Sequence, residues 1–137
     1  MSGVTASAPV PADALSAASA PTPTPMDTAN AGHYVWGGVC DGWHLLADPA
    51  LSVIQERVPP GAGEQTHRHH VAQQFFFILA GEAAITVEGR DVPLKAGQGL
   101  HVPAGVAHRF HNPGTMAVDF LVVSSPTTRG DRENLSP

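Results

Sequence analysis

Residues 61–81 read GAGEQTHRHHVAQQFFFILAG. In an extended segment successive side chains point to opposite faces, so His67 and His69 project their imidazoles from one face. Gln74 follows after a short interval and shares its face of the next strand with Phe76 and Ile78. The stretch therefore predicts β structure that carries two histidines and an amide oxygen as candidate metal ligands.

A second histidine segment, residues 97–112, reads GQGLHVPAGVAHRFHN. The Pro-Ala-Gly turn at 103–105 fixes the start of a strand that begins at His108. Three imidazoles and one amide oxygen suit Zn, Ni, Fe(II), Mn or Cu(II), with water or substrate completing the coordination shell. The two segments together predict a divalent metal site made of His67, His69, Gln74 and His108.

Apolar residues after position 32 come in short runs separated by turn residues, and no long run keeps a helical period. Glu88-Gly89 lies between two such runs and is typical of a tight hairpin. Short strands at this spacing indicate an all-β fold, either an antiparallel sandwich or a small barrel. The expected strands cover residues 34–39, 42–46, 51–58, 74–79, 83–87, 91–94, 99–102, 108–112 and 117–124.

The two histidine segments also carry spaced motifs. The first consists of Gly61, His67, His69, Gln74 and Gly81. The second consists of Gly97, Pro103, Ala104, Gly105, His108 and Asn112. Together they resemble the two motifs of the cupin family, in which Glu is more common at the position of Gln74. The resemblance covers residues 51–123 and implies a double-stranded β-helix, a jelly-roll barrel, with the metal held inside by the four candidate ligands.

The ends of the chain differ from its middle. Residues 1–32 are rich in Ala, Pro, Ser and Thr, and they cannot bury enough apolar area to offset the entropy of ordering. They also lack the basic start and apolar core of a signal peptide. We therefore expect a disordered tail over residues 1–32, a cupin-like domain over 33–125 with its core at 51–123, and a polar C-terminal tail over 126–137.

Composition excludes several classes of partner. The formal net charge is −5, and the seven Lys and Arg residues are scattered singly, so no basic patch for nucleic acid or membrane is expected. The single cysteine, Cys40, cannot form an intramolecular disulfide, which favours a cytoplasmic setting. Histidine is the unusual residue, with eight in the chain, and such clustering is typical of metal or proton-transfer sites.

Residues 75–79, FFFIL, are apolar on both faces of the expected strand. An outer strand of a barrel needs this only if its outward face is covered as well. The cover is either another part of the same chain or a second copy, and the second alternative predicts a homodimer.

The glutamine affects the chemistry expected of the site. Three neutral imidazoles and an amide leave a divalent ion with its full charge, so the ion polarises a carbonyl strongly. The resemblance extends to cupins with three His and one Gln, which include unsaturated-uronate lyases and some polyketide cyclases. Sugar-phosphate isomerases are a third possibility in the family, but the sequence contains no Gly-rich phosphate loop and no Arg cluster.

A proton-moving enzyme also needs an acid or base near its substrate. The candidates closest in sequence to the metal segments are Tyr34, Glu56, Glu64 and His101. An apolar pocket wall is expected from the side chains that share faces with the ligands, namely Phe76, Ile78 and Phe110.

The sequence thus favours a metal-binding cupin that acts as a non-redox isomerase, lyase or cyclase on a small organic substrate. Two alternatives remain open. One is a dioxygenase that uses Fe(II) and O2, and the other is a non-catalytic protein that binds a small molecule.

Overall fold

The computed structural model describes residues 22–135, so the expectations for residues 1–21 and 136–137 lie outside the described residues. Within the described range every regular element is a β-strand. No helix among these residues is long and apolar enough to cross a lipid bilayer. Residues 22–31 contain no strand, and a turn in which Ala31 N donates to Asp27 O (3.0 Å) leads into the first strand.

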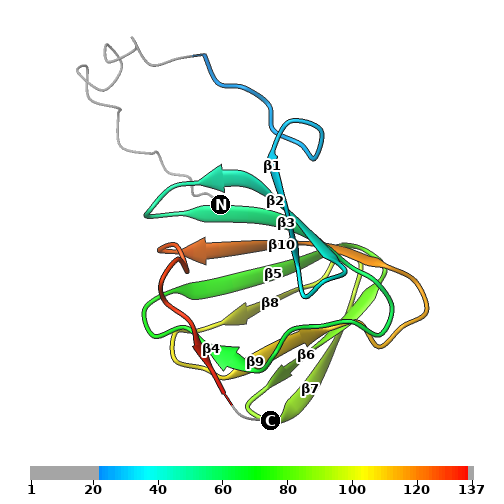
Figure 1. Cartoon of the computed structure of the whole chain (residues 1–137). Coiled ribbons are helices and arrows are strands. Elements are labelled where there is room, and N and C mark those ends of the chain that lie inside the picture. The colour runs from blue at the N-terminus through cyan, green and yellow to red at the C-terminus, as the bar shows by residue number, and fades with distance from the viewer. Residues whose placement is uncertain (1–21, 136–137) are drawn as a thin grey trace, which may run out of the picture.

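The strands form two antiparallel sheets that face each other, as Figure 1 shows. The larger sheet has the order β1 (Gly32–Trp36), β2 (Cys40–Ala47), β3 (Ser52–Val58), β10 (Val118–Ser125), β5 (Gln73–Ala80) and β8 (Gly99–Val102). The smaller sheet has the order β11 (Glu133–Asn134), β4 (His67–Arg68), β9 (His108–His111), β6 (Glu82–Val87) and β7 (Arg90–Lys95). The predicted all-β jelly-roll barrel is confirmed.

Strand alternation determines which side chains enter the barrel. In β10 the residues Val118, Phe120, Val122 and Ser124 are buried, and the residues between them are less so. The centre of the core is aromatic, because the rings of Phe110 and Phe120 stack from opposite sheets with centroids 3.8 Å apart. This stack closes one part of the barrel interior and leaves the space near Ser124 for polar groups.

The hairpin predicted at Glu88-Gly89 joins β6 to β7. Both turn residues have positive φ, 48° for Glu88 and 81° for Gly89. A two-residue turn with two positive φ angles matches the right-handed twist of the flanking strands, and glycine adopts such an angle without steric cost.

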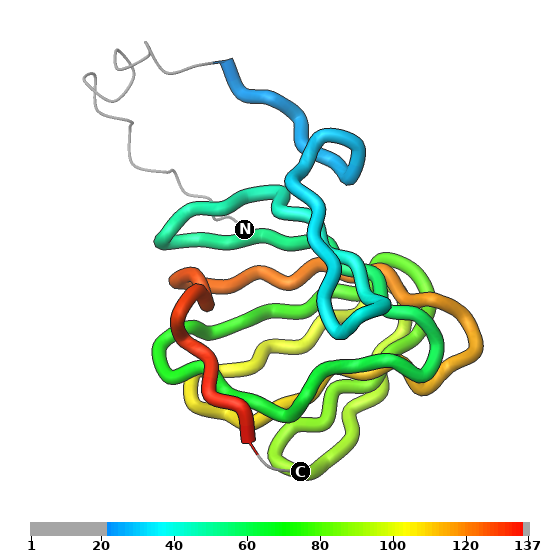
Figure 2. The backbone as a smooth tube through the Cα atoms, in the orientation of Figure 1, coloured from blue at the N-terminus to red at the C-terminus, as the bar shows by residue number. Residues whose placement is uncertain are grey.

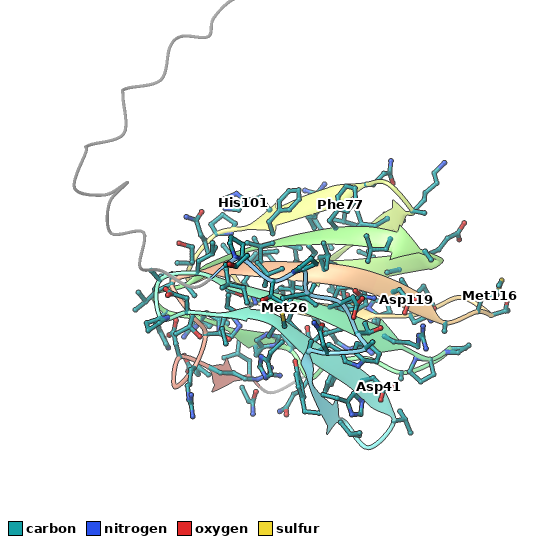
Figure 3. The ribbon with its side chains drawn as sticks, turned by 90° about the horizontal axis from the view of Figure 1, so that it is seen from above. Met26, Asp41, Phe77, His101, Met116 and Asp119 are labelled. Atoms are coloured by element: carbon teal, nitrogen blue, oxygen red, sulfur yellow. The ribbon has the colours of Figure 1, made fainter. Side chains whose placement is uncertain are left out.

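The outward face of β5 is apolar, as predicted from residues 75–79. Phe75 and Leu79 each keep 43% of their surface exposed. Phe75 pairs with Val123 and Phe77 with Leu121 of β10, and directly paired residues share a face of the sheet. Figure 3, which views the molecule from above, labels Phe77 on this side of the larger sheet. Among residues 22–135, Phe77 is partly buried, whereas Phe75 and Leu79 stay exposed.

The C-terminal residues differ from the expected polar tail. Residues 126–135, here called the C-terminal strap, leave β10 in the larger sheet and cross to the smaller sheet, where β11 pairs with β4 (Figure 2). Thr127 N donates to Pro49 O (3.0 Å) and Leu135 N to Thr66 O (2.9 Å), so the strap is attached near both ends. Backbone pairing and polar side-chain contacts, rather than apolar burial, hold the strap, which is why its polar composition resembles that of a tail.

Candidate metal centre

Three of the four predicted ligands come together through strand pairing. His67 of β4 lies directly opposite His108 of β9, and His69 follows β4 on the same side of the chain. One nitrogen from each of the three imidazoles lies within 4.8 Å of the others. All three side chains are buried. The three histidines can therefore hold one metal ion.

Backbone carbonyls fix the proton on each of these imidazoles. The Nδ1 atoms of His67, His69 and His108 contact the carbonyl oxygens of Gln65 (2.8 Å), Asp131 and Val106 (2.9 Å). A carbonyl can only accept, so each Nδ1 carries the proton and each Nε2 presents a lone pair. This is the tautomer in which histidine binds metal through Nε2, with its other nitrogen oriented by an outer hydrogen bond.

Burial keeps the imidazoles of His67 and His108 neutral. It lowers the pKa of His67 to about 4, and it lowers the pKa of His108 as well. A depressed pKa means that the uncharged, metal-binding form is present at neutral pH.

Gln74 lies in β5 of the larger sheet and places its amide oxygen beside the imidazole of His108. Its Nε2 donates to Ser124 Oγ (3.2 Å), which turns Oε1 toward Nε2 of His108, 3.0 Å away. Because Nε2 of neutral His108 is an acceptor, two lone-pair atoms face each other with no proton between them. A cation bound by both atoms would relieve this repulsion, so the donor set fits a divalent metal ion.

A cavity of about 230 Å³ opens beside these donors. His67, His69 and Gln74 form part of its wall, and three of the four acid–base candidates also line it: Tyr34, Glu56 and Glu64. The apolar part of the wall consists of Trp36, Ile54, Phe76 and Val122. Polar and apolar groups thus converge on one small space, as expected of a binding site for a small molecule.

One row of paired residues links Tyr34 to Glu56. Tyr34 of β1 lies opposite Gly42 of β2, which in turn lies opposite Glu56 of β3. A Cβ at position 42 would stand 2.2 Å from Tyr34 Cζ, so only glycine leaves room for the ring to cross β2. The Tyr34 hydroxyl then donates to Glu56 Oε2 (2.9 Å).

The two carboxyl groups in the cavity influence each other. Burial raises the pKa of Glu56 to about 8, and the charge of Glu64 is the second cause. Burial also raises the pKa of Glu64, against a hydrogen bond from Phe110 N (3.1 Å) that lowers it. Like charges in a buried space resist simultaneous ionisation, so the pair retains a proton near neutral pH.

His101 does not belong to the site. Its neighbours Leu100 and Val102 point inward from β8, so the imidazole points outward, where it is exposed and contacts Gln73 Oε1 (2.9 Å). Figure 3 labels it on the outer side of the larger sheet near Phe77. The expectation that His101 is an acid–base group of the pocket is therefore wrong.

Ile78 and Phe110 do not line the pocket either. Both point inward as predicted, but Ile78 lies opposite Phe120 and Phe110 stacks on Phe120, so both are fully buried in the apolar core. Of the three predicted wall residues only Phe76 borders the cavity. Strand period predicts the face of a side chain but not its depth along the barrel.

Sequence reasoning also missed the contribution of the strap. Thr128 and Arg132 line the cavity, and Asp131 holds the segment after β4. The Asp131 carboxylate accepts hydrogen bonds from the backbone N–H groups of His70 (2.8 Å), Val71 (3.0 Å) and Ala72 (2.9 Å). No local sequence pattern in residues 126–137 predicts these long-range hydrogen bonds.

Comparison with known proteins agrees with the fold. A family model described as the cupin domain matches residues 54–124. The oxalate-binding protein of Thermotoga maritima is 32% identical over 85 residues, which cover 58% of this chain and 70% of that protein. Mannose-1-phosphate guanylyltransferase of Klebsiella pneumoniae is 30% identical over 96 residues; this match covers 70% of the chain but only 20% of that enzyme.

A solved structure gives the same result. The crystal structure of a predicted oxalate decarboxylase from Thermotoga maritima matches with a TM-score of 0.67 and 24% sequence identity. The match covers 74% of this chain and 97% of the other. At this identity the likeness demonstrates a shared fold.

Proposed function

The chain belongs to the cupin family, and from that premise we propose that it is a metal-dependent enzyme of the isomerase, lyase or cyclase type. Its substrate is a small organic molecule with a carbonyl group. One observation carries the proposal: three Nε2 atoms and the Gln74 oxygen converge beside a cavity that also holds two carboxyls and a phenol.

In this proposal His67, His69, His108 and Gln74 hold the metal ion, which is zinc, nickel, iron or manganese. A bound divalent ion supplies Lewis-acid polarisation of the substrate carbonyl. The carbonyls of Gln65, Asp131 and Val106 keep the three imidazoles in the required tautomer. Phe76, Ile54 and Val122 exclude water from the apolar side of the cavity.

Glu56 and Glu64 move the proton. Since the pair retains one proton near neutral pH, one carboxyl can donate to the substrate while the other accepts. The Tyr34 hydroxyl orients Glu56 through its 2.9 Å hydrogen bond. Such a pair can transfer a proton next to a polarised carbonyl, which is the step that isomerases, lyases and cyclases share.

A solvent-exchange experiment tests this function. The metal-loaded protein is placed in D2O with a panel of small ketones and 2-oxo acids, and proton NMR follows loss of the C–H signal next to each carbonyl. Wild type should exchange at least one compound, and Glu56→Gln should slow the exchange about a hundredfold. Above about pH 8 the wild-type rate should fall, because Glu56 then loses its proton.

Glu82→Gln is the matched control, because Glu82 is an exposed carboxyl outside this cavity. Full activity of Glu56→Gln would contradict the assigned role. Oxygen uptake without exchange would favour the dioxygenase. Binding without either reaction would favour the non-catalytic alternative, which the resemblance to an oxalate-binding protein supports.

We also propose that two copies of the chain pair through the outer face of the larger sheet. Monomeric proteins seldom expose a large contiguous apolar patch. The outer face here carries exposed Phe75 and Leu79 beside partly buried Phe77, Leu121 and Val123. A two-fold dimer, the commonest assembly, covers the same patch on both copies.

Phe75→Asp and Phe77→Asp should therefore dissociate or precipitate the protein, because each places a charge in the covered patch. Light scattering at micromolar concentration should give a dimer mass for wild type. Met116→Asp is the control, since Met116 is 74% exposed in a loop away from this face (Figure 3). A monomer mass for wild type would rule the dimer out.

A further inference from the structure

Arg132 lies at the wall of the cavity, carried there by the C-terminal strap. Burial raises the pKa of Glu56 and Glu64, and the positive charge of Arg132 opposes that rise. Arg132 is exposed to solvent, and its charge also influences the carboxyl groups inside the cavity.

Arg132 forms no ion pair among residues 22–135, although two carboxyls share its cavity. The ion pairs in this range are His33–Asp41, Arg57–Asp119, Arg68–Glu133 and His70–Glu133. Arg132 Nε donates instead to the neutral amide oxygen of Asn134 (2.8 Å). This bond orients the side chain and leaves its charge without a carboxylate partner.

The strap holds Arg132 in place. Asp131, the preceding residue, accepts three backbone hydrogen bonds through its side chain and contacts His69 Nδ1 through its carbonyl. The next two residues form β11, and Glu133 also pairs with Arg68 (2.9 Å). Since the backbone is fixed on both sides of Arg132, which is itself exposed, mainly its side chain must be ordered when it binds a ligand.

We propose that the cavity takes a small carboxylic acid, and that Arg132 binds its carboxylate while the carbonyl of the same molecule faces the metal ligands. This inference rests on the proposed function and adds the substrate class. The planar guanidinium matches a carboxylate through two parallel hydrogen bonds. Among residues 22–135 the cavity wall has a single Arg and no Lys, which suits a carboxylate better than a phosphate dianion.

Size limits the ligand further. A cavity of about 230 Å³ is smaller than the range of about 300–1,000 Å³ that drug-sized molecules occupy. The wall of the cavity is partly apolar, and Ile54 and Val122 belong to that part. A short 2-oxo acid combines a carboxylate, a neighbouring carbonyl and a small apolar end, and it is the simplest molecule that meets these conditions.

Calorimetric titration of the metal-loaded, full-length chain tests the inference. The probes are pyruvate and 2-oxobutyrate, each compared with its uncharged amide. Wild type should bind at least one acid at least tenfold more tightly than the amide, and Arg132→Gln should remove that preference. Arg132→Lys should keep part of it, because the charge remains and the two-pronged geometry does not.

Arg129→Gln is the control, because Arg129 is an exposed arginine of the same strap that does not line the cavity. Metal content is measured in every variant, so a displaced strap that loosens His69 is detected separately. Equal binding of acids and amides by wild type, or an unchanged preference in Arg132→Gln, overturns the inference.

The two proposals can fail separately. If Arg132 governs acid binding but no carbonyl compound exchanges protons in D2O, the proposed function is wrong and the carboxylate site stands. If exchange occurs on neutral ketones as readily as on acids, with acids and amides bound equally, the function stands and the carboxylate site is wrong.

Discussion

His67→Ala, His69→Ala and His108→Ala should each lower the affinity for a divalent metal ion at least tenfold. Each substitution removes one of the three Nε2 donors that lie within reach of a common ion. Loss of an outer partner of a metal ligand already costs about 10–100-fold in affinity, so loss of the ligand itself should cost no less. Competition with a chromophoric chelator measures the affinity, and elemental analysis measures the metal per chain.

Thermal stability is a second readout, because a metal ion that binds only the folded state stabilises it. A ligand that binds only the folded state at about 100 times its dissociation constant stabilises it by about 2.7 kcal/mol. A tenfold loss of affinity would reduce this stabilisation to about 1.4 kcal/mol. Addition of a chelator should therefore lower the melting temperature of wild type clearly more than that of the three variants.

His70→Ala and His101→Ala are the controls. His70 is adjacent to a ligand but exposed and paired with Glu133 (2.8 Å), and His101 points away from the cavity. If all five variants retained metal equally, the three-histidine site would be wrong.

The part of this site that the sequence predicts depends on local geometry. His67 and His69 share a face because side chains in an extended segment alternate, and the turn at 103–105 places His108 at the start of β9. Strand pairing then brings His67 and His108 opposite each other. Alternation also predicts that Phe76 points inward, and it borders the cavity.

Periodicity carries no information on depth along the barrel, and this explains one of the errors. Ile78 has the correct face but lies beside Phe120 in the core. The error at His101 has another origin, because apolar Leu100 and Val102 flank it and strand alternation alone places the imidazole on the outer face of β8. Gly42 was a missed signal, because a glycine inside a strand marks the close approach of another side chain.

The strap could not be predicted from its own residues. Asp131 bonds to the backbone at Ala72, 59 positions away, and Arg132 enters the site because of that anchor. A polar segment held by backbone pairing has no apolar period, so its composition matches that of a solvated tail.

Gln74→Glu should bind the metal at least as tightly as wild type, yet slow the chemistry at least about tenfold. The substitution puts a negative charge where the amide oxygen faces His108 Nε2, 3.0 Å away. An anion is a better donor for a dication, but it also reduces the pull of the ion on a substrate carbonyl. Ser124 can still satisfy the new side chain, because its hydroxyl can donate to a carboxylate where it now accepts from the amide.

Gln73→Glu is the control that adds the same negative charge at a neighbouring position outside the metal site. Gln73 precedes Gln74 in β5 but is exposed on the opposite face of the strand, so the same added charge there should change neither metal affinity nor exchange rate. Gln74→Ala should loosen the metal, because it removes a donor without adding charge. Chelator competition and the D2O exchange assay measure the two effects on the same preparations. If Gln74→Glu behaved as wild type in both assays, Gln74 would not be a ligand, and a site of three histidines alone would make the dioxygenase an equal candidate.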